Sequence, residues 1–170
     1  MTAFADPLVE RIACFLVEIG LDVRHGAVPE RALLPGIDVR DGALIVDEAR
    51  LAHPGDLLHE AGHLAVTTPE RRAAMNGNVA AADRDTEASE EMMAIAWSYA
   101  AALHLGIAPE TVFHGDGYRG GSESILECFT HGRYFGVPML QYLGMACESK
   151  NAKARGVEPY PHMLRWLRAA

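Results

Sequence analysis

Hydrophobic and polar residues near the start of the chain follow a helical repeat. Between Pro7 and Ile19, apolar residues recur at intervals of three and four positions, and Gly20 follows directly. Such a repeat places the apolar side chains on one face of a helix, and a glycine commonly ends it. The pattern therefore predicts an amphipathic helix over 7–19 that packs by this face against the core.

The next pattern is a pair of short β-prone runs. Residues 37–40 and 43–47 flank the dipeptide Asp41-Gly42. A two-residue hairpin turn of type I′ needs positive φ at both central positions, and Asp-Gly meets this need well. The sequence thus predicts a β-hairpin over 37–47.

The rest of the chain is predicted to be helical, apart from a Gly-rich loop over 114–122. The longest expected helix begins with acidic residues, which the helix dipole favours, and continues as an apolar stripe through Met92, Ile95, Tyr99 and Leu103. The helices are expected at 57–66, 85–105, 123–131, 138–146 and 161–169. One helix, one hairpin and then helices only is an α+β pattern, mostly helical with a small sheet or hairpin.

Composition indicates an ordinary globular chain. Its 170 residues are 49% hydrophobic and 22% charged, enough to build a core, and we expect one domain over 1–170. The formal net charge of −8 opposes binding to a phosphate backbone, and Lys and Arg residues form no cluster. A nucleic-acid partner is therefore not expected.

The cysteines and the absence of long apolar runs bear on the compartment. Cys14, Cys128 and Cys147 are widely spaced and odd in number, so we expect buried thiols in a reducing compartment rather than a disulfide framework. Charged residues interrupt every possible signal-peptide core near the start, and no window approaches 18 uncharged apolar residues. These features predict a cytoplasmic protein without membrane association.

The most informative segment is His59-Glu60-Ala61-Gly62-His63, an HExxH sequence within a predicted helix. Histidines four positions apart project from the same helical face, so two imidazoles can bind one metal ion. Glu60 follows the first of them and can act as general base on a metal-bound water. Zn²⁺ suits two imidazoles and a carboxylate with a fourth position left for water. The segment predicts a zinc site.

The third ligand distinguishes the classes of zinc hydrolase. A metzincin would need Gly and His where this chain has Val66 and Pro69, so that class is excluded. A glutamate ligand would come from the next long helix, which opens with Glu87, Glu90 and Glu91. We prefer Glu91, because it lies one turn before the apolar stripe. Glu90 remains a competitor, and Glu87 lies one turn nearer the frayed end.

The segment 57–64, preceded by a hairpin and followed by an acidic, Ala-rich helix, resembles the ImmA/IrrE-type metallopeptidases. These are small bacterial zincins, and the resemblance covers about residues 43–108. The second helix keeps the family's glutamate at Glu91 and its last alanine at Ala96. It has Ile95 at the family's aromatic position and lacks the Leu-Met-Pro-like ending.

This resemblance implies a zincin-like fold of the gluzincin type. It also implies roles for four residues, with His59, His63 and Glu91 as zinc ligands and Glu60 as general base.

The Gly-rich loop 114–122 offers further candidates. Such a loop over a metal cleft could use His114 or Tyr118 to stabilise the oxyanion of a tetrahedral intermediate. The alternative is a structural turn whose glycines supply positive φ. Nearby, we expect His53 at a helix entry, and Ser122 and Ser124 as helix caps.

These observations lead to two functional hypotheses. The first is a zinc-dependent metallohydrolase, a peptidase in which Glu60 activates a zinc-bound water and the hairpin aligns an extended peptide or protein substrate. The second is a non-catalytic zinc-binding or regulatory protein on a zincin-like scaffold. Its closed site would need a fourth ligand, for which His114 is the candidate. The Ala-rich stretch 94–102 could pack within the chain or across a homo-oligomer.

Overall fold

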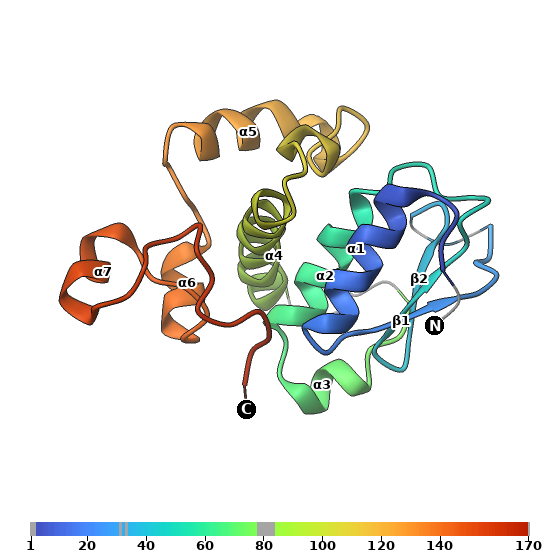
Figure 1. Cartoon of the computed structure of the whole chain (residues 1–170), viewed down its shortest axis with the longest axis horizontal. Coiled ribbons are helices and arrows are strands. Elements are labelled where there is room, and N and C mark those ends of the chain that lie inside the picture. Colours follow the sequence, from blue (N-terminus) through green and yellow to red (C-terminus); the bar gives the residue numbers. More distant parts are fainter. Residues whose placement is uncertain (1–2, 31, 33, 78–83, 170) are drawn as a thin grey trace.

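The computed structural model describes residues 3–30, 32, 34–77 and 84–169, and for residues 84–87 the backbone alone. The fold is α+β, with a small sheet beside a larger helical part (Figure 1). The helices are α1 (Pro7–Glu18), α2 (Asp56–Val66), α3 (Pro69–Ala73), α4 (Arg84–His104), α5 (Ser122–Thr130), α6 (Val137–Tyr142) and α7 (Ser149–Arg155). The strands are β1 (Asp22–His25), β2 (Ile37–Arg40) and β3 (Ala43–Val46), and short 3₁₀ turns are η1 (Pro109–Thr111) and η2 (Tyr118–Gly120).

The sheet contains the predicted hairpin and one strand that was not predicted. Strands β2 and β3 pair antiparallel, and Asp41 and Gly42 in the turn have φ of 48° and 75°, as a type I′ turn requires. Strand β1 pairs in parallel with β3, so the order is β1-β3-β2 and β2 is an edge strand. Only Val23 of β1 is buried. A strand is predicted from alternating buried and exposed positions, and a single buried residue gives no such alternation. The sequence of β1 therefore does not predict a strand.

Helix α1 forms where the apolar repeat predicts it. The Asp6 side chain caps it by accepting a hydrogen bond of 2.7 Å from the Leu8 N–H. Val9, Ile12 and Leu16 are buried on the face that meets the core. The prediction of this amphipathic helix is confirmed.

Helices α2 and α4 pack closely against each other near the centre of the molecule (Figure 1). Gly62 permits this approach, because a Cβ atom there would lie 2.9 Å from the Ala94 carbonyl oxygen. The Ser98 hydroxyl lies between the helices, 3.2 Å from the Leu58 carbonyl oxygen. The faces of α2 and α4 that meet are thus held in a fixed register.

The Ala-rich stretch of α4 is buried within the chain. Trp97 and Tyr99 are buried in the core, and Tyr99 confirms this part of the expected apolar stripe. Met92 and Leu103 are 37% and 42% exposed, so the expected apolar stripe is wrong at these two positions. The alanines that pack in the interior are Ala94, Ala96, Ala100, Ala101 and Ala102.

The C-terminal part differs most from the predictions. The helix expected over 161–169 is wrong, because backbone groups there bond to distant segments instead of to one another. The Leu164 N–H donates to the Met145 carbonyl, the Arg168 N–H donates to the Ala65 carbonyl, and both distances are 2.8 Å. Helices α3 and α7 were not predicted, and α6 ends four residues earlier than expected.

The cysteines only partly match the expectation of buried thiols. Cys147 is buried, Cys128 is partly buried and Cys14 is exposed, which corrects the prediction for Cys14. All three are free thiols. Among the described helices, none has the length and apolar character needed to cross a membrane.

Candidate metal centre

Helix α2 presents two histidines to α4. His59 and His63 lie one turn apart, and their Nε2 atoms are separated by 3.2 Å. Each side chain is only 14% exposed, because α2 is covered by neighbouring elements. The HExxH spacing therefore brings two ring nitrogens together at one point.

Glu91 of α4 completes this group. Its carboxylate oxygens lie 3.1 Å from His63 Nε2 and 3.7 Å from His59 Nε2. The close packing at Gly62 allows a side chain of α4 to reach the two imidazoles. We refer to His59, His63 and Glu91 as the helical cluster.

Glu90, the competing candidate, does not share this position. Glu90 is buried and binds Arg71 of α3 through both carboxylate oxygens, one of them at 3.1 Å from Nη2. The Glu87 side chain lies outside the described residues. Adjacent positions on a helix point in directions about 100° apart, so Glu90 and Glu91 meet different partners. Glu91 is the glutamate that lies beside the histidines.

The spacing of the helical cluster suits a tetrahedral metal ion. Ligand atoms 2.0–2.1 Å from a tetrahedral zinc ion lie about 3.3 Å from one another. The two histidine nitrogens are 3.2 Å apart, and Glu91 places one carboxylate oxygen 3.1 Å from His63 Nε2 and its other oxygen 3.7 Å from His59 Nε2. Among the described residues, the cluster has these three members. They could hold a divalent ion and leave one position open.

Burial and charge set the protonation of the cluster. Burial, together with the charge of His63, lowers the pKa of His59 to about 4, and its buried Nδ1 has no hydrogen-bond partner among the described residues. Burial opposes protonation of His63, but its hydrogen bond to Glu91 and the charge of Glu60 raise its pKa overall. Burial by itself would raise the pKa of Glu91, but the hydrogen bond to His63 and the charge of His59 lower it overall. His59 is therefore a neutral imidazole at neutral pH.

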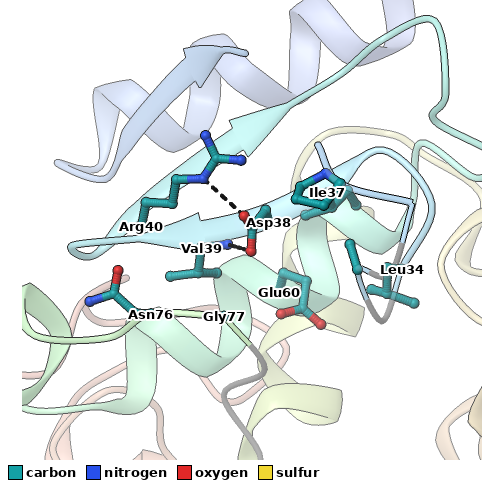
Figure 2. Close-up of a pocket in the computed structure, with 10 residues that line it drawn as sticks. Leu34, Ile37, Asp38, Val39, Arg40, Glu60, Asn76 and Gly77 are labelled. Carbon is teal, nitrogen blue, oxygen red and sulfur yellow. Dashed lines mark hydrogen bonds and ion pairs between the residues drawn. The ribbon is translucent and has the colours of Figure 1, made fainter. Parts of the chain in front are cut away.

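Glu60 faces a cavity beside the edge of the sheet. The cavity has a volume of about 470 Å³ and is bordered by Glu60, by β2 and by the segment Asn76-Gly77 (Figure 2). The Gly77 N–H donates to the Val39 carbonyl at 2.7 Å, so this segment already covers the second half of β2. Burial raises the pKa of Glu60, although the charge of His63 opposes the shift. Glu60 thus combines access to a cavity with an increased affinity for a proton.

Tyr118 approaches the helical cluster from the Gly-rich loop. Its ring centroid lies 5.1 Å from that of His59, with the rings edge to face. Its hydroxyl is buried and has no hydrogen-bond partner among the described residues. Burial and the charge of Glu91 raise the tyrosine pKa, so the hydroxyl keeps its proton. It is therefore a buried donor next to the histidines.

His114 belongs to a second group. Its Nε2 lies 2.9 Å from Oδ1 of Asp56, in the first turn of α2, and its ring stacks on His53. His53, His114 and Asp116 each have one possible ligand atom, and these three atoms lie within 4.8 Å of one another. We refer to these three residues as the loop cluster. His53 is thus more than a helix-entry residue.

Ser122 and Ser124, in the first turn of α5, do not cap this helix. The residue at the cap position is Gly121, and no side chain provides a capping bond. The Ser122 hydroxyl instead donates to the His114 carbonyl at 2.6 Å, because the loop folds back over this serine. Ser124 is an exposed residue inside the helix, so both capping predictions are wrong.

Sequence reasoning missed three residues near the site. Asp56, Asp116 and Arg71 contact the residues discussed above, yet none stands at a spacing that indicates a site. An aspartate at the start of a helix, such as Asp56, is explained equally well by the helix dipole. Their partners come from other segments of the chain.

No protein-family model matches the chain, and neither a curated protein nor a solved structure is significantly similar to it.

Proposed function

We propose that this protein is a zinc-dependent metallohydrolase that cleaves peptide bonds, on a zincin-like scaffold of the ImmA/IrrE type. The observation that carries the proposal is the helical cluster, in which one ligand atom each of His59, His63 and Glu91 lies within 4.8 Å of the other two, together with Glu60, which follows His59 and lines a cavity. A purely structural zinc site has no need of the glutamate that follows the first histidine. This arrangement favours a hydrolase.

His59, His63 and Glu91 would hold the ion. Zinc, when bound, would polarise the scissile carbonyl and lower the pKa of water, which is the chemistry this ion supplies in hydrolases. Glu60 accepts the proton of the attacking water and passes it to the nitrogen of the leaving amine. Its raised pKa suits a group that must take up and then release a proton.

The substrate would be an extended peptide. Strand β2 is at the edge of the sheet and borders the cavity that Glu60 faces (Figure 2). The edge of β2 is itself largely occupied, because the Ile37 N–H donates to the Leu34 carbonyl at 3.3 Å and the Val39 carbonyl accepts from the Gly77 N–H. A peptide or protein substrate would therefore be held by the walls of this cavity and not as an added strand of the sheet.

Tyr118 would supply the second contact to the reacting carbonyl. Its unpartnered, protonated hydroxyl beside His59 is a donor without an acceptor among the described residues. A donor of this kind stabilises the oxyanion of a tetrahedral intermediate. His114, whose Nε2 donates to Asp56, is the weaker candidate for this role.

Metal content tests the ligand set. We expect His63→Ala and Glu91→Ala each to lower the zinc content by about one ion per chain. Glu90→Gln is the matched control, because an amide can still bond to Arg71, and it should keep the parent's zinc content. Equal zinc content in the parent, His63→Ala and Glu91→Ala, measured by elemental analysis after dialysis, would refute the site.

Hydrolysis tests the reaction. Glu60→Gln should keep its zinc and cleave a fluorogenic peptide library about 10²- to 10⁴-fold more slowly than the parent. Equal cleavage by the two zinc-loaded proteins would remove Glu60 from the mechanism. A parent that binds zinc and cleaves no member of the library would favour the non-catalytic alternative. That alternative has less support at present, because His114, its candidate fourth ligand, belongs to the loop cluster.

A further inference from the structure

The loop cluster joins two segments that are far apart in sequence. His53 precedes α2, whereas His114 and Asp116 lie in the Gly-rich loop before η2. The two imidazole rings stack with centroids 3.7 Å apart and planes at 14°. The lone pair of an imidazole lies in the plane of its ring, so the nitrogens of two stacked rings do not meet at one metal ion. The stack is therefore a contact that holds the loop and not a pair of ligands.

His114 fastens the Gly-rich loop to the first turn of α2. Its Nε2 donates to Asp56 Oδ1 across 2.9 Å, because a carboxylate only accepts. The side chains of His114 and Asp56 are only 14% and 10% exposed, and a hydrogen bond to a charged group is stronger than one between neutral groups. Asp56 precedes His59 by three positions in α2. The bond thus fixes the loop relative to the helix that carries the two histidines of the helical cluster.

Hydrogen bonds within the loop connect its two ends. The Ser122 hydroxyl donates to the His114 carbonyl at 2.6 Å, and the Gly117 N–H donates to the same carbonyl at 3.1 Å. The Gly121 N–H donates to the Tyr118 carbonyl at 2.9 Å. These bonds close the segment from His114 to Ser122 into successive turns. A movement of His114 is therefore passed on to Tyr118.

The backbone at Tyr118 is held in a conformation that a tyrosine rarely adopts. The φ angles of Tyr118 and Arg119 are 55° and 52°, in the left-handed region that favours glycine. Two consecutive residues of this kind persist only where the surrounding structure imposes the conformation. In this conformation the Tyr118 ring lies 5.1 Å from the ring of His59 and 5.2 Å from that of Phe113. Without the contacts of His114, we expect the backbone to relax and the Tyr118 hydroxyl to leave this place.

We propose that His114 is a positioning residue for the reaction of the helical cluster, which fixes the Gly-rich loop on the first turn of α2 and thereby holds the Tyr118 hydroxyl beside His59. This inference rests on the proposed function, in which that hydroxyl stabilises the oxyanion. His114 then acts without touching the substrate. His53 supports it by stacking on its ring, and Asp56 by accepting its N–H.

A double-mutant cycle tests this role. His114→Phe keeps a flat ring that can stack on His53 and removes the N–H that Asp56 accepts. We expect it to lower kcat for a fluorogenic peptide about tenfold, with KM and zinc content near those of the parent. Tyr118→Phe should lower kcat about 10²-fold, because it removes the donor itself. The double variant should be no slower than Tyr118→Phe, since the place of the hydroxyl matters only when the hydroxyl is present.

Three further variants control this cycle. His114→Gln should recover most of the lost kcat, because its amide N–H reaches about as far as Nε2 of histidine and can still bond to Asp56. His53→Ala removes only the stack at a side chain that is 35% exposed, and should lower kcat about threefold. His131→Phe changes an exposed histidine that bonds to the Glu127 carbonyl, and should have the kcat of the parent.

The cycle overturns the proposal if His114→Phe lowers kcat by the same factor in the parent and in Tyr118→Phe. A general loss of structure would give this result, whereas an effect through the Tyr118 hydroxyl would not.

Trypsin tests the anchoring of the loop without catalysis. Arg119 is exposed and follows Tyr118 directly, so trypsin can cleave after it. We expect cleavage there, followed by the mass of the fragment that ends at Arg119, to be about tenfold faster in His114→Phe than in the parent. His114→Gln and His131→Phe should be cleaved at the rate of the parent. Equal rates in the parent and His114→Phe would show that His114 does not hold the loop.

The two assays separate this inference from the proposed function. If the zinc-loaded parent cleaves peptides and the cycle is additive, the proposed function stands and the role of His114 fails. If the zinc-loaded parent cleaves no peptide, the proposed function fails, and with it the catalytic role of His114. The trypsin rates then decide only whether His114 holds the loop.

Discussion

The helical cluster and the loop cluster contain the same residue types in different settings. Each has two histidines and one carboxylate. In both clusters one ligand atom of each residue lies within 4.8 Å of the other two. The imidazole rings of the helical cluster meet edge to face at 85°, whereas those of the loop cluster stack at 14°. Glu91 is 40% exposed and Asp116 is 83% exposed.

The difference lies in what holds the side chains. Residues of the helical cluster stand on two helices in close backbone contact at Gly62, so the packing of the core sets their distances. The loop cluster depends on a stacked ring, a hydrogen bond to Asp56 and an adjustable aspartate. The lone pair of an imidazole lies in the plane of its ring, so two rings that meet edge to face can direct their nitrogens at one ion, whereas two stacked rings cannot. We therefore expect zinc at the helical cluster and not at the loop cluster.

The largest effect on stability is expected at Gly62, where α2 and α4 are in close contact. Gly62→Val places side-chain atoms against the Ala94 carbonyl and should lower the free energy of unfolding by about 3 kcal/mol. Because it forces α2 and α4 apart, it should also weaken zinc binding at the helical cluster. Urea denaturation measures the first effect and zinc titration the second.

The control for this change is Gly115→Ala. A Cβ atom at Gly115 has no atom within 4 Å, so this variant should have the stability of the parent. If Gly62→Val and Gly115→Ala are equally stable, the close approach of the helices does not determine the geometry of the helical cluster.

A smaller effect is expected at the partner of Glu90. Arg71→Ala leaves the buried Glu90 carboxylate without its ion pair and should cost about 2 kcal/mol of unfolding free energy, since water can reach part of the gap. Arg133→Ala is the matched control, because its pair with Glu127 is exposed on both sides and contributes less than about 0.5 kcal/mol. Equal urea midpoints for the two variants would show that Glu90 does not require Arg71.

The loop cluster should respond to the carboxylate behind His114. Asp56→Asn replaces a charged acceptor of the His114 N–H by a neutral one and should lower the free energy of unfolding by about 1.5 kcal/mol. Asp22→Asn, which alters an exposed ion pair with Arg24, is the control and should have the stability of the parent. Equal urea midpoints for the two variants would contradict the role of the Asp56 carboxylate.

The smallest effect is expected at the serine behind the loop. Ser122→Ala removes the hydrogen bond to the His114 carbonyl and should lower the free energy of unfolding by about 1 kcal/mol. Ser124→Ala, in the same helix but exposed, should have the stability of the parent. Thermal melts of the two variants compare them directly. Similar melting temperatures would show that the buried hydroxyl does not hold the loop.

Much of the architecture could be predicted because its signals are local. The helical repeat of α1 and the Asp41-Gly42 turn are periodic or conformational features that neighbouring residues specify. The failures share one cause. Strand β1 exists only through its pairing with β3, and the segment expected as a helix over 161–169 satisfies its backbone through bonds to Met145 and Ala65. The pattern of neighbouring residues does not indicate which distant segment will form these hydrogen bonds.

The sequence by itself determined that His59 and His63 lie together and that Glu60 points elsewhere, because the helical period fixes the directions of residues one and four positions apart. Only the tertiary structure decided that Glu91 meets the histidines while Glu90 meets Arg71, since that choice depends on how α4 packs against α2 and α3. It also decided that His53 and His114 stack, although 60 residues separate them. Contacts between distant segments depend on the packing of the whole chain.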